Sequence, residues 1–255
     1  MEGARLLISD LDGTLLGNDA ALERFADWHE TVRGSVRLAY NSGRFFESVS
    51  ELVASTPLPA PDAVIGGVGT DIRIFPYGER VDGWPRPLAP WRRRDILSAL
   101  ARYRELEPQR DEYQAEFKLS YYAPDLDCAF LVDLRRRLAA SGQFVEIVYS
   151  SNRDLDVLPA GINKGSAASF LATCWGFTPE RVIVAGDTGN DASMFARGFR
   201  GIVVDNGDAQ LKCLRGADVY HSGEAHADGV LDGLEHWLSS DVGHVSNVPK
   251  TDKAR

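Results

Sequence analysis

The sequence predicts an α/β protein in which a core built on a parallel β-sheet is interrupted by an inserted α+β segment. Two observations support this prediction. Short apolar strands alternate with helical stretches at both ends of the chain, which is typical of βαβ units. The middle segment, about residues 81–158, instead contains strands whose side chains alternate between apolar and polar, as in a sheet with one exposed face. A chain of 255 residues can form one large domain or a core plus a smaller domain.

The first part of the chain is predicted to contain three strands. Leu6–Ser9 is a short apolar run closed by acidic and glycine residues. A second strand lies within Val36–Arg44, and a third begins residues 62–75, which continue through a glycine turn into a hairpin-like segment. Helical periodicity predicts helices at Ala20–Glu30 and Phe45–Ala54. We assign residues 1–80 to the first part of the core.

The middle segment, residues 81–158, is predicted to be a separate small domain. Its helices are expected at residues 91–106 and 126–142. Its strand-like runs are residues 116–123, 143–150 and 153–159.

The core pattern returns in residues 159–240. A helix is expected at 163–177, and residues 181–195 form a buried strand, an acidic loop and the start of a helix. A short strand at 200–207 and a helix at Ala225–Ser239 complete this part. Residues 241–255 lack an apolar period, and we expect them to be a disordered tail.

Composition and charge exclude several classes of function. The net charge of −9 argues against general binding to nucleic acid or to an acidic membrane surface. The three cysteines are widely separated and odd in number, so we expect reduced cysteines in the core rather than disulfides or a metal site. No signal-peptide pattern is present, and no apolar run approaches the ~18 residues of a membrane span. We therefore expect a cytoplasmic protein.

Polar side chains follow three of the predicted core strands. Asp10 and Asp12 come directly after the first strand, and because side chains alternate along a strand, they are expected to project the same way. The residues that follow the other two strands are Ser42, Asp187, Asn190 and Asp191. Ligands bind at the carboxyl ends of strands in open α/β sheets, and carboxylate oxygens suit Mg²⁺. The sequence therefore predicts a magnesium site at this edge.

Each of these residues alone has a simpler explanation. Asp10 and Asp12 could form a strand-end turn, Ser42 could cap a helix, and Lys164 could be an ordinary surface lysine. Asp187 and Asp191 could lie at a helix N-terminus. Their occurrence together favours a common site.

The order of four motifs adds a family resemblance. "DLDGT", "NSGR", Lys164 within "INKG" and "GDTGND" resemble the motifs of the haloacid dehalogenase superfamily of phosphatases over about residues 6–238. The resemblance implies a Rossmann-like core, and the insert looks like a type-2 (Cof-like) cap. Within that group, "FKLSYY" and "YSSNRDLDVLP" are similar to the sucrose-6-phosphate phosphatase branch.

The resemblance also implies roles for individual residues. Asp10 would be the nucleophile and Asp12 the general acid and base. Mg²⁺ would be held by Asp10, the backbone carbonyl of Asp12 and Asp187, with Asp191 either as a further ligand or as a support for the ligands. The residues expected to bind phosphate are Ser42, Gly43, Lys164 and Asn190. The residues expected to contact the rest of the substrate are Arg44, Thr70, Asp71, Lys118, Asn152 and Asp154.

The implied function is Mg²⁺-dependent hydrolysis of a small-molecule sugar phosphate, with sucrose 6-phosphate as the first candidate. Mannosylfructose phosphate, glucosylglycerol phosphate and mannosyl-3-phosphoglycerate are alternatives, because Asp71 stands where this branch is expected to carry glutamate. A phosphotransferase or mutase and a non-catalytic sugar-phosphate sensor are further alternatives. We expect a monomer, and a synthase that makes the phosphorylated sugar is a plausible pathway partner.

Overall fold

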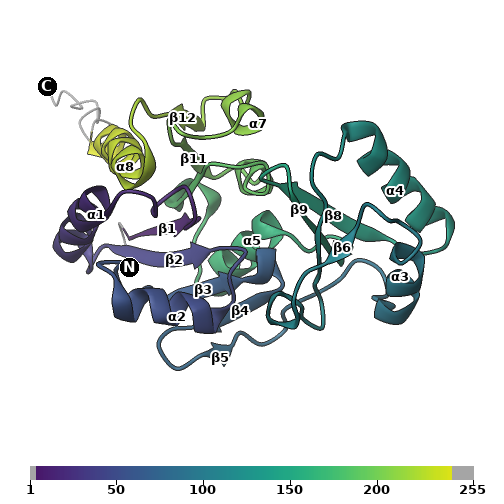
Figure 1. Cartoon of the computed structure of the whole chain (residues 1–255). Coiled ribbons are helices and arrows are strands. Elements are labelled where there is room, and N and C mark those ends of the chain that lie inside the picture. The colour runs from purple at the N-terminus through teal and green to yellow at the C-terminus, as the bar shows by residue number, and fades with distance from the viewer. Residues whose placement is uncertain (1–3, 243–255) are drawn as a thin grey trace, which may run out of the picture.

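The computed structural model describes residues 4–242 and contains two β-sheets, one of eight strands and one of four. Figure 1 shows the larger sheet beside helices α1, α2, α5 and α8, and the smaller sheet beside helices α3 and α4. The predicted α/β class with a parallel-sheet core is confirmed. Within residues 4–242, none of the helices combines the length and the apolar character that a membrane span requires.

The larger sheet has β1 near its middle. Its strand order is β12-β11-β10-β1-β2-β3-β4-β5, in which β12 to β3 are parallel and β4 and β5 are antiparallel additions. The strands are β1 (Arg5–Ser9), β2 (Val36–Asn41), β3 (Ala63–Gly66), β4 (Asp71–Ile74), β5 (Glu79–Arg80), β10 (Val182–Gly186), β11 (Arg200–Val203) and β12 (Val219–His221). The chain leaves β1 toward β2 on one side, and β10 lies on the other. The carboxyl end of β1 is therefore a topological switch point, where ligands bind in such sheets.

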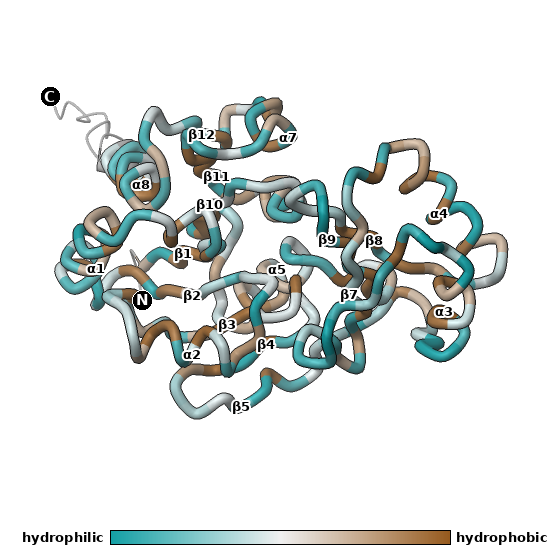
Figure 2. The backbone as a smooth tube through the Cα atoms, viewed as in Figure 1, coloured by the Kyte–Doolittle hydropathy of each residue, from teal (hydrophilic) through white to brown (hydrophobic). Residues whose placement is uncertain are grey.

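Helices cover both faces of the larger sheet. Side chains of β1 alternate between two apolar clusters: Leu7 packs with Phe25 on the face covered by α1 and α8, and Leu6 packs with Leu171 on the face covered by α5. In Figure 2, strands of the larger sheet coincide with hydrophobic segments of the chain. The helices are α1 (Asp19–Val32), α2 (Phe46–Ser55), α5 (Lys164–Cys174), α6 (Ala192–Phe195), α7 (Ala209–Lys212) and α8 (His226–Val242), with short 3₁₀ turns η1 (Gly67–Gly69) and η3 (Pro179–Arg181).

The smaller sheet is antiparallel and carries two helices on one face. Its order is β6-β7-β9-β8, and Leu119, Tyr121 and Leu155 pack with those helices in a third apolar cluster. The elements are α3 (Arg93–Leu100), β6 (Glu107–Pro108), η2 (Asp111–Tyr113), β7 (Leu119–Tyr122), α4 (Cys128–Ala140), β8 (Val145–Ser150) and β9 (Asp154–Pro159). We call this unit, residues 93–159, the cap.

One predicted helix is too long. The helix expected at 91–106 ends at Leu100. Two successive turns follow, in which the Tyr103 N–H donates to Leu100 O and the Leu106 N–H donates to Tyr103 O. These turns repeat every three residues and bring Leu106 into the cap core, so the apolar spacing imitates a helix.

Two further expectations need correction. Cys128, Cys174 and Cys213 are free, but all three are exposed rather than in the core. Helix α8 continues to Val242, so the first two residues of the expected tail are helical. The remainder of the expected tail, residues 243–255, lies outside the described residues.

Candidate active site

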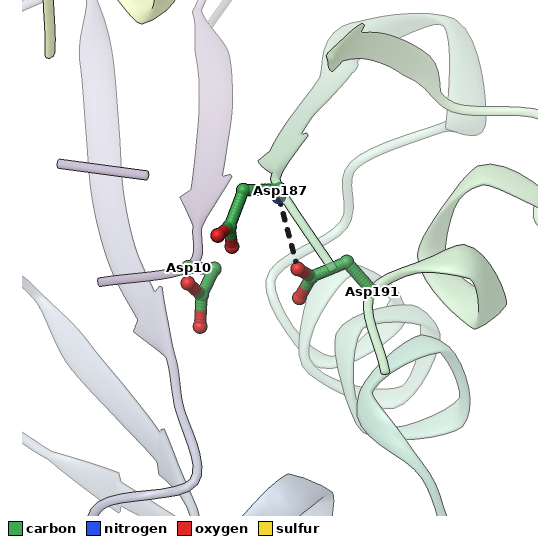
Figure 3. A group of neighbouring side chains, drawn as sticks. All are labelled: Asp10, Asp187 and Asp191. Carbon is green, nitrogen blue, oxygen red and sulfur yellow. Dashed lines mark hydrogen bonds between the residues drawn. The ribbon is translucent and has the colours of Figure 1, made fainter. Parts of the chain in front are cut away.

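Asp10, Asp187 and Asp191 gather at the carboxyl end of β1. The Asp10 N–H donates to Ala185 O at 3.0 Å, which continues the pairing of β1 with β10 by one residue. Asp187 follows β10 directly, and Asp191 follows four residues later. All three carboxylates are buried, and one oxygen from each lies within 4.8 Å of the others (Figure 3). This is an oxygen-rich site of the kind that binds a hard divalent cation.

Lys164 is fully buried between two of these carboxylates. Its Nζ donates to Asp10 Oδ1 at 2.5 Å and to Asp191 Oδ1 at 2.6 Å. Lys164 is the first residue of α5, and the Asn163 side chain caps that helix by accepting from the Ser166 N–H. The buried Asn41 side chain donates to Lys164 O at 2.9 Å. The helix start and Asn41 together fix where the ammonium group lies.

Short polar contacts hold the two acidic loops together. The Thr14 hydroxyl lies 3.1 Å from both Asp10 Oδ2 and Asp187 Oδ1. Asp191 Oδ2 accepts from the backbone N–H groups of Asp187 and Thr188, each at 3.1 Å. Gly13 has a φ of +86°, and a Cβ there would lie 2.2 Å from Asp187 Oδ2. The turn after β1 therefore requires glycine at this position.

The site carries more negative charge than Lys164 can balance. Burial raises the pKa of Asp10 to about 8, opposed by Lys164 and reinforced by Asp191 and Asp187. Burial and then the neighbouring Asp191 raise the pKa of Asp187 to about 7. Desolvation lowers the pKa of Lys164, but Asp10 and Asp191 outweigh it, so that the pKa is raised overall. The cluster favours further positive charge, either protons or a metal ion.

Asp12 is held by a different cation. Arg44 Nε donates to Asp12 Oδ2 at 2.8 Å, and Arg44 Nη2 donates to Asp12 Oδ1 at 2.7 Å. About half of the Asp12 side chain is exposed, in contrast to buried Asp10. The two neighbouring carboxylates are thus kept apart by separate partners.

A cleft of about 670 Å³ extends from Asp10 to the cap. Its cap wall is the polar face of the smaller sheet, including Lys118 and Asp156. Lys118 Nζ lies 2.9 Å from Asp156 Oδ1 and donates to Ser120 Oγ at 2.6 Å. Only 4% of Lys118 is exposed, so Lys118, Ser120 and Asp156 form a buried polar cluster and not a solvated surface.

The structure brings most of the predicted site residues to this cleft. Besides Asp10 and Asp187, those that line it are Asp12, Gly43, Arg44, Lys118, Asp154 and Asn190. Ser42 is fully buried beside it, and its Oγ accepts from the Arg44 N–H at 3.2 Å. Asp154 Oδ1 accepts from Gln109 Nε2 at 2.8 Å.

Three predicted substrate contacts lie elsewhere. Thr70 and Asp71 line a neighbouring pocket of about 190 Å³, where Asp71 pairs with Arg73 and Arg80. Asn152 donates to Asp125 Oδ1 at 2.6 Å on an exposed turn of the cap.

Some residues of the site had no individual role in the sequence-based prediction. Thr14 is part of the "DLDGT" motif, so its closeness to Asp10 and Asp12 in the sequence could have indicated a place in the site. Asn206 and His226 each contact Gly13 O, at 2.7 Å and 3.1 Å, and so hold the turn after β1. No local pattern indicates them, because both are far from Gly13 in the sequence. Tyr113 lines the cleft from a short 3₁₀ turn with no periodic pattern.

Comparisons with known proteins agree with this geometry. Residues 3–238 match the family of sucrose-6F-phosphate phosphohydrolases. The mannosylfructose-phosphate phosphatase of Agrobacterium fabrum is 37% identical over 93% of this chain and 98% of its own length. Sucrose-phosphatase 1 of Nicotiana tabacum is 32% identical, and the match covers 92% of this chain but 59% of the tobacco protein.

A solved structure also resembles this chain over most of its length. The sucrose-phosphatase of Synechocystis, determined in complex with sucrose and phosphate, superposes with a TM-score of 0.84. It is 30% identical and covers 93% of this chain and 98% of the Synechocystis chain. The protein therefore belongs to the sucrose-6F-phosphate phosphohydrolase family of the haloacid dehalogenase superfamily and is a sugar phosphatase.

Proposed function

We propose that the protein is a Mg²⁺-dependent phosphatase for the phosphate ester of a fructose-containing disaccharide, with Asp10 as the nucleophile. The observation that carries the proposal is the buried cluster of Asp10, Lys164, Asp187 and Asp191, which opens into a cleft with a polar cap wall. Sucrose 6-phosphate and mannosylfructose phosphate are the two leading substrates. The family match supports the first, and the 37% identical Agrobacterium enzyme supports the second.

The cluster fits a divalent cation. Asp10, Asp187 and the backbone carbonyl of Asp12 would hold Mg²⁺, which supplies positive charge against the phosphoryl oxygens when it is bound. Both oxygens of Asp191 already accept hydrogen bonds, from Lys164 and from two backbone N–H groups. Asp191 therefore acts mainly by orienting Lys164 and the loop after β10.

Two carboxylates divide the chemistry. An Asp10 oxygen attacks phosphorus and displaces the sugar oxygen, which takes a proton from Asp12. Asp12 then takes a proton from water as the water oxygen attacks the aspartyl phosphate, which releases phosphate and restores Asp10. Lys164, Gly43, Ser42 and Asn190 would surround the phosphoryl group and stabilise its charge.

The charges of the cleft favour a sugar without a second anionic group. Its three lining cations each pair with a carboxylate: Arg44 with Asp12, Lys118 with Asp156, and Arg153 with Asp154. These ion pairs can donate hydrogen bonds to sugar hydroxyl groups and accept hydrogen bonds from them. A substrate carboxylate, in contrast, would find every lining cation already paired with a protein carboxylate. We therefore rank mannosyl-3-phosphoglycerate, which carries a carboxylate, below the neutral disaccharide esters. Glucosylglycerol phosphate, whose sugar part is also uncharged, remains a third candidate.

The direct test is phosphate release from a panel of esters with Mg²⁺ present. The panel contains sucrose 6-phosphate, mannosylfructose phosphate, glucosylglycerol phosphate, mannosyl-3-phosphoglycerate and simple hexose phosphates. We expect a disaccharide ester to have the highest kcat/KM, and Asp10→Asn to abolish turnover, whereas Asp71→Asn, outside the cleft, retains it. Transfer of phosphate to an acceptor sugar would instead indicate a phosphotransferase. No turnover by a folded, Mg²⁺-loaded protein would favour a sensor.

Three further parts of the proposal concern the setting of the enzyme. We propose a monomer, which light scattering after size-exclusion chromatography would test. We propose a cytoplasmic location, which the three free cysteines support because thiols stay reduced there. The reaction class that must supply the substrate is a glycosyl transfer onto a sugar phosphate, and a synthase of that class is the proposed pathway partner.

A further inference from the structure

The two carboxylates of the first motif are held by cations from different parts of the fold. Lys164 at the start of α5 binds Asp10, and Arg44 just before α2 binds Asp12. The Arg44–Asp12 pair consists of two parallel bonds, 2.8 Å and 2.7 Å long, which engage both oxygens of Asp12. Such a two-bond pair fixes direction as well as distance.

The Arg44 side chain has a firm support. Its Nη1 donates to Ser48 Oγ in the first turn of α2 at 3.3 Å. Its backbone N–H donates to Ser42 Oγ at 3.2 Å, and its carbonyl accepts from the Gly67 N–H at 3.0 Å. The Arg44 backbone is therefore tied to the segments that follow two neighbouring strands, β2 and β3, and its guanidinium group is tied to the first turn of α2.

The backbone around Asp12 is also fixed, but its side chain is not buried. Leu11 O accepts from the N–H groups of Leu15 and Leu16, at 3.0 Å and 2.8 Å, and this closes the turn that carries Asp12. About half of the Asp12 side chain remains exposed at the cleft. With the backbone held and little packing around the carboxylate, Arg44 decides where that carboxylate points.

We propose that Arg44 is a positioning residue that aims Asp12 at the leaving-group oxygen of the substrate. This inference rests on the proposed function. When Asp12 carries the proton that it will donate, its other oxygen can still accept a hydrogen bond from Arg44. This single hydrogen bond keeps the protonated carboxyl group in place. Donation of that proton to the sugar oxygen, as its bond to phosphorus breaks, restores the two-bond pair. In this role Arg44 contacts neither phosphorus nor the leaving oxygen.

Leaving groups separate this role from binding of phosphate or support of the fold. p-Nitrophenolate leaves without needing a proton, whereas a sugar alkoxide needs one. The constant kcat/KM covers the steps up to departure of the leaving group. Arg44→Lys keeps the positive charge but cannot form the two-bond pair. We expect this variant to lower kcat/KM for the preferred disaccharide phosphate by about 10- to 100-fold, and for p-nitrophenyl phosphate by less than about threefold.

Two controls sharpen the result. Arg73→Lys alters an arginine that pairs with Asp71 and Glu47 outside the cleft, and it should change neither constant. In an Asp12→Asn background, Arg44→Lys should cause little further loss on the sugar ester, because both changes affect the same step.

Three outcomes would overturn the inference: equal losses on both esters, no loss on either, or full additivity with Asp12→Asn. Equal losses would mean that Arg44 serves the phosphate or the fold. If the wild-type protein turns over neither ester, the proposed function fails as well. If the wild type is active but Arg44→Lys lacks the selective loss, only this inference fails.

Discussion

Binding of Mg²⁺ is expected to release protons from the site, in a number that depends on pH. The pKa of Asp10 is raised to about 8 and that of Asp187 to about 7 in the metal-free protein. At pH 6, roughly nine-tenths or more of each group is then protonated, whereas at pH 9 both are largely ionised. Because the metal binds carboxylates, we expect about two protons to be released per ion at pH 6 and almost none at pH 9. The apparent affinity should rise on the order of 10³-fold over this range.

Isothermal titration calorimetry measures this release. Titrations at each pH in buffers of different ionisation enthalpy give the number of protons from the slope of the observed enthalpy. Asp187→Asn should lower the release at pH 6 by about one proton and weaken binding. Asp71→Asn, the matched change outside the cleft, should leave both unchanged. A release that does not vary between pH 6 and pH 9, or equal effects of the two variants, would refute the reasoning.

The remaining predictions concern stability and metal binding. The folded pKa of Asp10, about 8, exceeds its unfolded value of 3.8, so this group favours the fold at low pH and loses that contribution as pH rises toward 8. Metal-free wild type should therefore unfold at lower urea concentration at pH 8 than at pH 5, and Asp10→Asn should reduce this difference; an unchanged difference would contradict the assignment. Gly13→Ala places a Cβ 2.2 Å from Asp187 Oδ2 and should weaken Mg²⁺ binding at least about tenfold by calorimetry; wild-type affinity would show that the turn can adjust. Lys118→Met leaves buried Asp156 with the Ser120 hydroxyl but without its cationic partner and should cost about 3 kcal/mol in urea unfolding; a loss below about 1 kcal/mol would mean that water replaces the lysine.

The main elements and the acidic cluster were predictable because strong local patterns specify them. Apolar runs mark the strands, and parallel strands bring their carboxyl ends to one edge, so Asp10 and Asp187 were expected at the same edge. The pairing of β1 with β10 then brings them together. Strands β5, β6 and β12 were not predicted, since two or three residues are too few to show a period. Their positions depend on pairing with neighbours rather than on their own side chains.

Contacts between distant segments were the less predictable part of the site. The alternating pattern places Lys118 on the polar face of its strand. It cannot show that this face lines the cleft between the cap and the larger-sheet unit, where Lys118 is buried. The pairing of Arg44 with Asp12 depends on side-chain direction, which spacing does not specify. Likewise, Asp71 follows the glycine turn as expected, yet its arginine partners on β4 and β5 draw it into a separate pocket.

The alternation of side chains on the cap strands has a consequence for how substrate preference can change during evolution. On β9, Leu155 and Val157 pack in the cap core, whereas Asp154 and Asp156 line the cleft, so the cleft surface can vary without disturbing the packing. The buried pairing of Asp156 with Lys118 limits this freedom, because replacing one member leaves the other charge uncompensated. A new sugar preference at this position therefore requires two coordinated replacements, and the single-substitution intermediate is the less stable protein.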